Sequence, residues 1–354
     1  MKASIGTSRP TTLAGGRSRL RSRPAVLALF AAAGTLATLG PIAGAAPTPA
    51  TARNGAAVNL AGVTLHIGDQ AGSGAESLLK AAGLLNKLPF KVQWADFTSG
   101  PPMLQAEAAG SVDIGAVGDS PPIFALSGGA QLDLVEALSA GPAAAALLVP
   151  KGSNVTSVSQ LKGKTIAVAQ GSSANYHVLV ALQKAGLSVK DVTLDYLQPA
   201  AALAALTSGQ VAAWDVWTPF IEEAEADGAR PIANGTLTGT TYSFEVASKA
   251  ALANPGKAAA IRAYLADTNR AYAWEKTHAS AWATTWAQAT GLSLTIMDKA
   301  TKDDVSTPAP ISNAVITSEQ SVANAFFTTG LVPSKVNIGA AAYFGYANLF
   351  QAAN

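Results

Sequence analysis

The 354-residue sequence contains no cysteine, and this absence bears on several classes of protein. We expect no disulfide-stapled domain, no zinc site built on thiolates, no thiol enzyme and no lipoprotein anchored through a cysteine. Histidine is also scarce, because His66, His177 and His278 are the only three and lie far apart in the sequence. Histidines placed in this way are mostly structural, so we expect neither a metal site nor another cofactor.

Charged residues are few, at 13% of the sequence, and they are unevenly distributed. Six of the 24 Lys and Arg residues and none of the 22 acidic residues precede Ala46, which leaves 18 basic residues and a net charge of −4 after that point. The basic character of the whole sequence therefore belongs to its first segment. A mildly acidic domain would be repelled by the negatively charged phosphates of a nucleic acid, so we expect no nucleic-acid partner.

The first segment has the pattern of a secretory signal peptide, because basic residues are followed by the apolar run Ala25–Leu39 and then by small residues. We expect a signal peptide over residues 1–45 with cleavage after Ala45, or alternatively after Ala52. An uncleaved membrane anchor is the other interpretation, although the apolar run is short for a membrane span. Residues 46–57 predict a flexible tether. The protein should therefore be exported, to the periplasm or the cell envelope.

From Val58 onward, short β-branched runs alternate with stretches rich in Ala and Leu, which predicts an α/β fold with parallel sheets covered by helices. The predicted strands are Val63–Ile67, Val92–Trp94, Val112–Val117, Leu132–Leu138, Leu147–Val149, Thr165–Ala169, Val192–Leu197 and Ala212–Val216. The predicted helices are Ala75–Leu85, Asn175–Ala185, Ala200–Thr207 and Pro219–Ala226, and the chain becomes mainly helical after Pro255.

Two stretches, Leu104–Pro121 and Leu203–Pro219, repeat one order of features: a helix, a Gly-led turn, an apolar strand, and a proline that opens a new helix. The repetition predicts two lobes that face a shared cleft, because open α/β sheets bind ligands at the carboxyl ends of their strands. We expect residues 58–146 to form the first part of lobe 1, residues 147–241 to form lobe 2, and residues 242–354 to return to lobe 1 and end in helices.

The strand at Thr165–Ala169 is followed by a loop that suits an anion. The chain turns through Gly171, and either Ser172 or Ser173 lies at the N-cap of the next helix. Backbone N–H groups at such a helix start attract an anion without any Lys or Arg. An ordinary capped helix is an equal interpretation of this fragment alone.

Loops of similar character at residues 69–74, 98–102 and 118–122 follow three other predicted strands, which favours a ligand cleft. In the third loop we expect Asp119 to cap the helix that opens at Pro121. Trp214 and Trp217 lie near another strand end, where they would form either an aromatic wall or part of the core.

Motifs for catalysis are incomplete. Residues 162–165 resemble the end of a P-loop, but Val158 stands where the upstream glycine is required, and the segment leads into a strand. Residues 171–175 lack the final glycine of a nucleophile elbow. We therefore expect no enzyme.

Six motifs occur in a fixed order along the chain: Thr98–Leu104, Gly110–Gly115, Gly118–Ala125, Leu161–Lys164, Gly171–Ser173 and Trp214–Pro219. Together with Gly330–Ile338 they resemble the aliphatic sulfonate-binding proteins of ABC importers, in the wider nitrate/sulfonate/taurine group. The resemblance extends from about residue 65 to residue 338.

This resemblance implies a two-lobed periplasmic-binding-protein fold of type II that closes on its ligand by hinge motion. It also implies a small anionic or zwitterionic ligand, no catalysis, and an ABC permease with its ATPase as partners, and we expect a monomer. By matching position, the ligand contacts would be Ser73, Ser99, Asp119, Ser120, Ser172, Ser173 and Trp214.

The sequence departs from the family pattern at one position, because W-x-x-W-D-P reads here with Thr218 in place of the acid. Asp215 is nearby, but on a strand its side chain would point away from the side of Trp214. The ligand therefore stays open between an alkanesulfonate, a taurine-like zwitterion and another sulfur or nitrogen compound. The alternatives to transport are an extracytoplasmic sensor and an enzyme on this fold, such as the pyrimidine-synthesising enzymes, whose cysteine-rich motif is absent here.

Overall fold

The computed structural model describes residues 58–70, 74–139, 141, 144–239, 241–303 and 305–350. The expected signal peptide and tether lie outside the described residues. Within the described residues, no helix combines the length and the apolar character that crossing a membrane requires.

The described chain contains two β-sheets. The first sheet has six strands, in the spatial order β11 (Thr307–Ala309), β4 (Leu132–Ser139), β10 (Tyr242–Ser248), β3 (Ile114–Val117), β1 (Thr64–Gln70) and β2 (Lys91–Phe97). The second sheet has five strands, in the order β7 (Thr193–Tyr196), β6 (Thr165–Val168), β8 (Ala213–Trp217), β5 (Ala145–Val149) and β9 (Arg230–Asn234).

The prediction of parallel sheets holds for only part of each sheet, because both sheets are mixed. Strands β1–β3 are parallel to one another, as are β6, β7 and β8. By contrast, β10 is antiparallel to β3 and β4, and β5 is antiparallel to β8 and β9. A parallel neighbour needs a helical crossover from the same sheet, whereas β5 and β10 each follow a strand of the other sheet.

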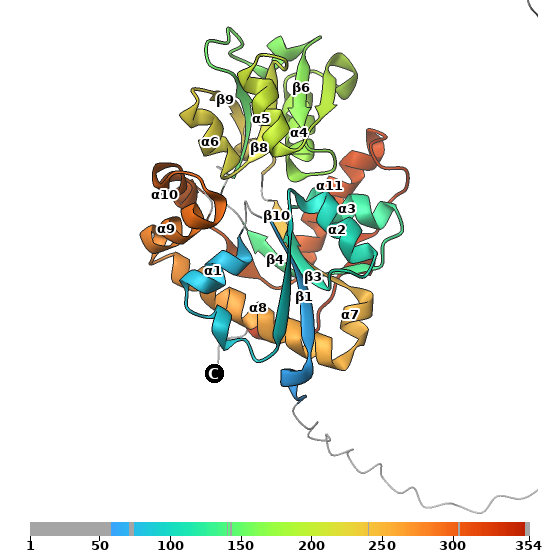
Figure 1. Ribbon diagram of the computed structural model, residues 1–354. Coiled ribbons are helices and arrows are strands. Elements are labelled where there is room, and N and C mark those ends of the chain that lie inside the picture. Colours follow the sequence, from blue (N-terminus) through green and yellow to red (C-terminus); the bar gives the residue numbers. More distant parts are fainter. Residues whose placement is uncertain are drawn as a thin grey trace, which may run out of the picture. The chain divides into compact units, whose positions relative to one another are not determined.

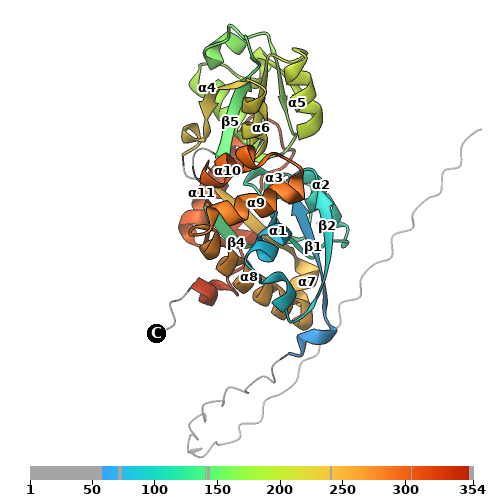
Figure 2. The ribbon, with the colours of Figure 1, turned by 60° about the vertical axis from the view of Figure 1, so that its left-hand side comes forward.

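Helices cover both faces of each sheet. In Figure 1, α1 and α9 lie on one side of the first sheet and α2 and α3 lie on the other, and Figure 2 shows α4, α5 and α6 around the second sheet. The helices are α1 (Ala75–Ala81), α2 (Gly100–Ala108), α3 (Ser120–Ser127), α4 (Ser173–Lys184), α5 (Pro199–Thr207), α6 (Phe220–Ala226), α7 (Lys249–Ala253), α8 (Pro255–Glu275), α9 (Ala279–Thr290), α10 (Leu294–Asp303) and α11 (Asn313–Thr328).

The close packing of α2 on the first sheet depends on two glycines. A Cβ atom at Gly68 in β1 would lie 2.5 Å from the Met103 sulfur, and one at Gly115 in β3 would lie 2.7 Å from it. Met103 itself is fully buried. Because a larger residue at either strand position would push Met103 away, these glycines determine how closely α2 packs on the sheet.

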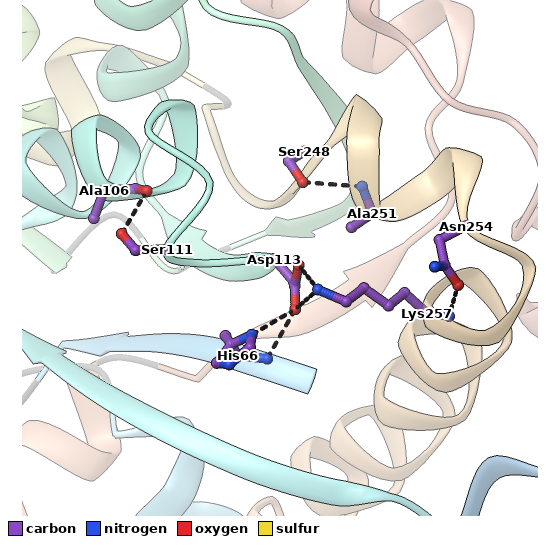
Figure 3. Close-up of polar contacts among 8 residues, drawn as sticks. All are labelled: His66, Ala106, Ser111, Asp113, Ser248, Ala251, Asn254 and Lys257. Atoms are coloured by element: carbon purple, nitrogen blue, oxygen red, sulfur yellow. Dashed lines mark hydrogen bonds and ion pairs between the residues drawn. The ribbon is translucent and has the colours of Figure 1, made fainter. Parts of the chain in front are cut away.

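A buried carboxylate, Asp113, connects β1, β3 and α8 near the first residues of β1 (Figure 3). Asp113, just before β3, accepts hydrogen bonds from the His66 backbone N–H at 2.9 Å and from the Lys257 ammonium of α8 at 2.7 Å. Its carbonyl oxygen accepts from the Ser248 N–H at 3.0 Å. Asp113 is 4% exposed, so its charge is compensated inside the fold.

Two glutamates face each other in the first sheet. Glu136 of β4 is opposite Glu245 of β10 in the antiparallel register, and both are fully buried. Asn269 of α8 donates to Glu136 at 3.0 Å. Burial, helped by the neighbouring Glu245, raises the pKa of Glu136 to about 9, and burial raises the pKa of Glu245 to about 8. Both carboxyl groups therefore favour the protonated state near neutral pH.

Candidate functional site

A cavity of about 490 Å³ lies at the carboxyl ends of strands from both sheets. Its walls include the starts of α2, α3 and α4, the end of β8, and parts of α8 and α9. Two carboxylates, Asp119 and Glu275, line it, and no Lys, Arg or His does so among the described residues. No group of three or more metal-ligating side chains gathers in the described part of the chain. Any anion here must therefore be held by neutral donors.

The starts of α2 and α3 share one arrangement, a polar N-cap residue followed by one residue and two prolines. In α3 the N-cap is Asp119, and positions N2 and N3 are Pro121 and Pro122. A capping side chain accepts from the N–H of N2 or N3, and proline has none. The expectation that Asp119 caps this helix is therefore wrong, and its side chain makes no capping hydrogen bond.

The start of α4 offers more donors, because it has no proline. Ser172 is the N-cap, as expected, but its hydroxyl donates to the Ala169 carbonyl at 2.7 Å. The backbone N–H groups of Ser173 and Ala174 donate to no acceptor in the described part of the chain, and both residues line the cavity. Gly171 has φ +72°, and its Cα packs against the Phe124 ring, where a Cβ would lie 3.1 Å from it. A side chain at this position would therefore strain the turn that aims these donors.

Asp119 is held by serines rather than by a cation. Ser120 Oγ donates to Asp119 Oδ1 at 2.7 Å, and the Ser173 hydroxyl donates to the same carboxylate. Burial nevertheless raises the pKa of Asp119 to about 6, because these hydrogen bonds only partly offset the loss of water. The loop at Gly118 lies so close to α4 that a Cβ there would be 1.8 Å from Ser173 Oγ. The loop after β3 of the first sheet thus contacts the start of α4, which packs on the second sheet, at the wall of the cavity.

The remaining predicted contact residues fall in different places. Ser73 lies outside the described residues. Ser99 is buried at the N-cap of α2, and its hydroxyl donates to Gln198 at 2.9 Å, at the start of α5. Ser120 is also buried, and its hydroxyl donates a hydrogen bond to Asp119. These serines shape the loops and leave few hydroxyls directed at a ligand.

The structure places Trp214 in the core and Trp217 at the cavity. Trp214 is 1% exposed and packs beneath α5, whereas Trp217 is half-buried and lines the cavity. Side chains three positions apart in a strand point to opposite faces, and Trp217 lies at the strand end. Asp215 is also away from the cavity, where it bonds to His177 Nδ1 at 2.7 Å.

One wall of the cavity is aromatic and continues into the core of the first sheet. Trp282 and Trp286, one helical turn apart in α9, stack with ring centroids 5.0 Å apart and also line the cavity. Tyr272 and Glu275 at the end of α8 line it beside them. No local signal distinguishes this role from packing, because the chain brings α8 and α9 to the cavity from far along the sequence.

With this geometry established, comparison with known proteins identifies the family. Residues 63–299 match the NMT1-like family. The chain belongs to the NMT1-like family. This NMT1-like chain is 36% identical over 280 residues to an aliphatic sulfonates-binding protein of Escherichia coli, an alignment that covers 77% of this chain and 86% of the relative.

Solved structures agree with this assignment. The alkanesulfonate-binding protein SsuA from Xanthomonas axonopodis pv. citri, solved with bound MOPS, has a TM-score of 0.75 and 34% identity, and the match covers 79% of this NMT1-like chain and 98% of SsuA. The periplasmic aliphatic sulphonate binding protein SsuA from E. coli has a TM-score of 0.71 and 34% identity, covering 79% and 92%. The predicted family resemblance and the two-lobed binding-protein fold are confirmed.

Proposed function

We propose that this chain is an exported solute-binding protein that delivers an organosulfonate to an ABC importer. The observation that carries the proposal is the cavity, where the starts of α2, α3 and α4 converge without any basic side chain among the described lining residues. The names of its relatives, which describe aliphatic sulfonate and alkanesulfonate binding, support it. These relatives are binding proteins, which favours transport over catalysis.

The proposed anion contacts are backbone groups. The N–H groups of Ser173 and Ala174 in α4 are the main donors, and the N–H of Gly100 at the start of α2 adds to them. Each bond from an N–H to a charged oxygen contributes about 1.5–3 kcal/mol. A sulfonate suits such donors because it carries a single charge, whereas a doubly charged phosphate would be repelled more strongly by Asp119.

We also propose the organisation that delivery requires. The first sheet would form lobe 1 from residues 58–146 and 242–354, and the second sheet would form lobe 2 from residues 147–241, with hinge motion between them. In support of this division, β5 begins at Ala145, close to the proposed boundary, and β10 begins at Tyr242. A signal peptide over residues 1–45 would direct the export of the chain. The exported monomer would then deliver its ligand to an ABC permease and its ATPase.

Calorimetric titration of the exported protein tests the proposal. We expect binding of linear alkanesulfonates, and much weaker binding of inorganic phosphate and of alkanecarboxylates of equal length. Replacing both Ser172 and Ser173 by Ala should weaken sulfonate binding by about 10–100-fold, because the turn loses the Ser172 bond to the Ala169 carbonyl and the backbone donors of α4 lose their orientation. Ser208→Ala, an exposed hydroxyl that bonds only within α5, is the matched control. Failure of every sulfonate to bind would overturn the proposed function.

A further inference from the structure

Gly118 occupies a position where the backbone does not require a glycine. It directly follows β3 at the wall of the cavity, and it is not among the glycines that have a positive φ. A residue with a Cβ atom could therefore adopt the same backbone conformation without strain. The reason for a glycine must instead lie in the space around it.

One residue limits the space around Gly118. A Cβ atom there would lie 1.8 Å from Ser173 Oγ and 3.1 Å from Ser173 Cβ, and no other heavy atom of the described chain, its sequence neighbours aside, lies within 4 Å. Turning the hydroxyl away would still leave the Cβ atom of Ser173 in close contact. By contrast, Gly68 and Gly115 face Met103, which packs on their own sheet. A side chain at residue 118 would therefore collide only with α4, on the other proposed lobe.

Further contacts join the two proposed lobes around the cavity. The Thr98 and Ser99 hydroxyls, just before α2, donate to Gln198 Oε1 at 3.0 and 2.9 Å, and Gln198 is the N-cap of α5. On α10, Lys299 forms an ion pair with Glu225 of α6. None of these five residues lines the cavity. Their contacts hold the two proposed lobes close together without touching the space for the ligand.

We propose that Gly118 is a positioning residue that sets how closely the two lobes approach, and that tight ligand binding depends on its missing side chain. The inference rests on the proposed function, because it assumes that the anion lies at the start of α4 while lobe 1 covers it. A side chain at residue 118 would hold α4 away from the starts of α2 and α3. Apparent affinity falls in proportion to the population of the competent arrangement, so a reduction of that population to about a tenth weakens binding about 10-fold.

Calorimetry with butane-1-sulfonate and hexane-1-sulfonate tests the proposal in Gly118→Ala. Both affinities should fall about 10-fold and by the same factor, because the added Cβ faces Ser173 and not the ligand tail. The melting temperature of the ligand-free protein should change by less than about 3 °C, because no neighbour within lobe 1 is displaced. Gly62→Ala is the matched control, since a Cβ there meets no described atom within 4 Å and Gly62 does not line the cavity.

A compensating substitution on the other lobe distinguishes a collision from a general disturbance. Ser173→Gly removes both atoms that the new Cβ would meet, so adding Gly118→Ala to that variant should weaken binding by no more than about twofold. Ser173→Ala keeps the Cβ atom at 3.1 Å, so it should restore affinity only in part. Additive losses in the double variant would overturn the proposal, as would a Gly118→Ala variant that binds like the wild type.

A cross-link tests the approach of the lobes without any ligand. Because the chain has no cysteine, Gly118→Cys combined with Ser173→Cys supplies its only two thiols. The Cβ separation of 3.1 Å is slightly below the range of about 3.5–4.5 Å in disulfides, so a small parting of the lobes would allow the bond. Oxidised glutathione should close it, as seen by thiol titration and non-reducing electrophoresis, whereas Gly62→Cys with Ser173→Cys should stay reduced.

The cross-link and the titrations fail independently. If the thiols at residues 118 and 173 stayed reduced, the lobes would not approach there and the proposal would be rejected. If the cross-link formed but the wild type bound no sulfonate, the proposed function would be rejected, while the approach of the lobes at Gly118 would stand.

Discussion

The affinity for an alkanesulfonate should increase as the pH is lowered from about 8 to about 5, and Asp119→Asn should remove most of this dependence. Burial raises the pKa of Asp119 to about 6. The carboxylate is therefore charged at the upper end of this range and neutral at the lower end, while a sulfonate stays ionised throughout. Ser173 donates its hydroxyl to Asp119 and supplies a backbone N–H to the proposed anion site, so the charge of Asp119 lies near the bound anion and opposes binding.

The magnitude follows from the separation. For a charge separation of about 7 Å and an effective dielectric constant of about 20, the repulsion between the Asp119 carboxylate and a bound sulfonate is about 2 kcal/mol. A difference of that size changes Kd by about 30-fold. Because Asp119 is almost fully buried, solvent screens little of this interaction.

Other titrating groups near Asp119 must be separated from it. Tyr176, His177 and Glu319 all interact with its charge. The Asp215 carboxylate and hydrogen bond outweigh the effect of burial and raise the pKa of His177, so this ring would gain a positive charge as the pH falls and would strengthen anion binding in the same direction. The slope that remains in Asp119→Asn measures this second contribution.

The assay is a calorimetric titration with one alkanesulfonate at several pH values, applied to the wild type, Asp119→Asn and the surface control Asp195→Asn. We expect the wild type and the control to follow the same curve, and Asp119→Asn at pH 8 to bind about as tightly as the wild type at pH 5. A wild-type Kd that does not change with pH, or an Asp119→Asn variant that keeps the full slope, would refute the electrostatic argument.

Three further predictions concern other parts of the chain. Asp113→Asn should lower the free energy of unfolding by about 1–2 kcal/mol in thermal denaturation without changing sulfonate affinity, because its partners are remote from the cavity and one is partly exposed. Trp214→Ala should cost about 3–5 kcal/mol of stability, whereas Trp217→Ala should weaken sulfonate binding by about 5–30-fold with a smaller loss of stability. N-terminal sequencing of the exported protein should find a terminus between Ala46 and Arg53; an intact Met1 would refute cleavage.

The strands and helices that hydrophobic patterning could find were those with strong apolar runs. The predicted strands correspond to β1–β8; β10 is not among them, and the edge strands β9 and β11 were missed as well. Both are short edge strands that contain a proline, Pro231 and Pro308, and neither has a clear apolar alternation. Their pairing depends on neighbours that a local pattern does not reveal.

For the candidate site, the sequence predicted those features that depend only on neighbouring residues in the chain. The turn at Gly171 and the start of α4 were recognisable because a strand, a glycine and serines occur together. The failure of Asp119 to cap α3 was also readable, since the two prolines that follow it are visible in the sequence. The wall formed by Glu275, Trp282 and Trp286 could not be predicted from the sequence, because its position at the cavity depends on how α8 and α9 pack on the first sheet.

The facing pair Glu136 and Glu245 makes the folded protein a store of bound protons. Unfolding would return both carboxyl groups to ordinary pKa values near 4.5, so it would release protons at neutral pH. The folded pKa values are the higher ones, so the stability that these groups confer is fully present below about pH 4.5 and is lost as the pH rises through about 8 to 9. In between, each proton released lowers the unfolding free energy by about 1.4 kcal/mol per pH unit. The native chain should accordingly migrate in an electric field as a less acidic particle than its composition suggests.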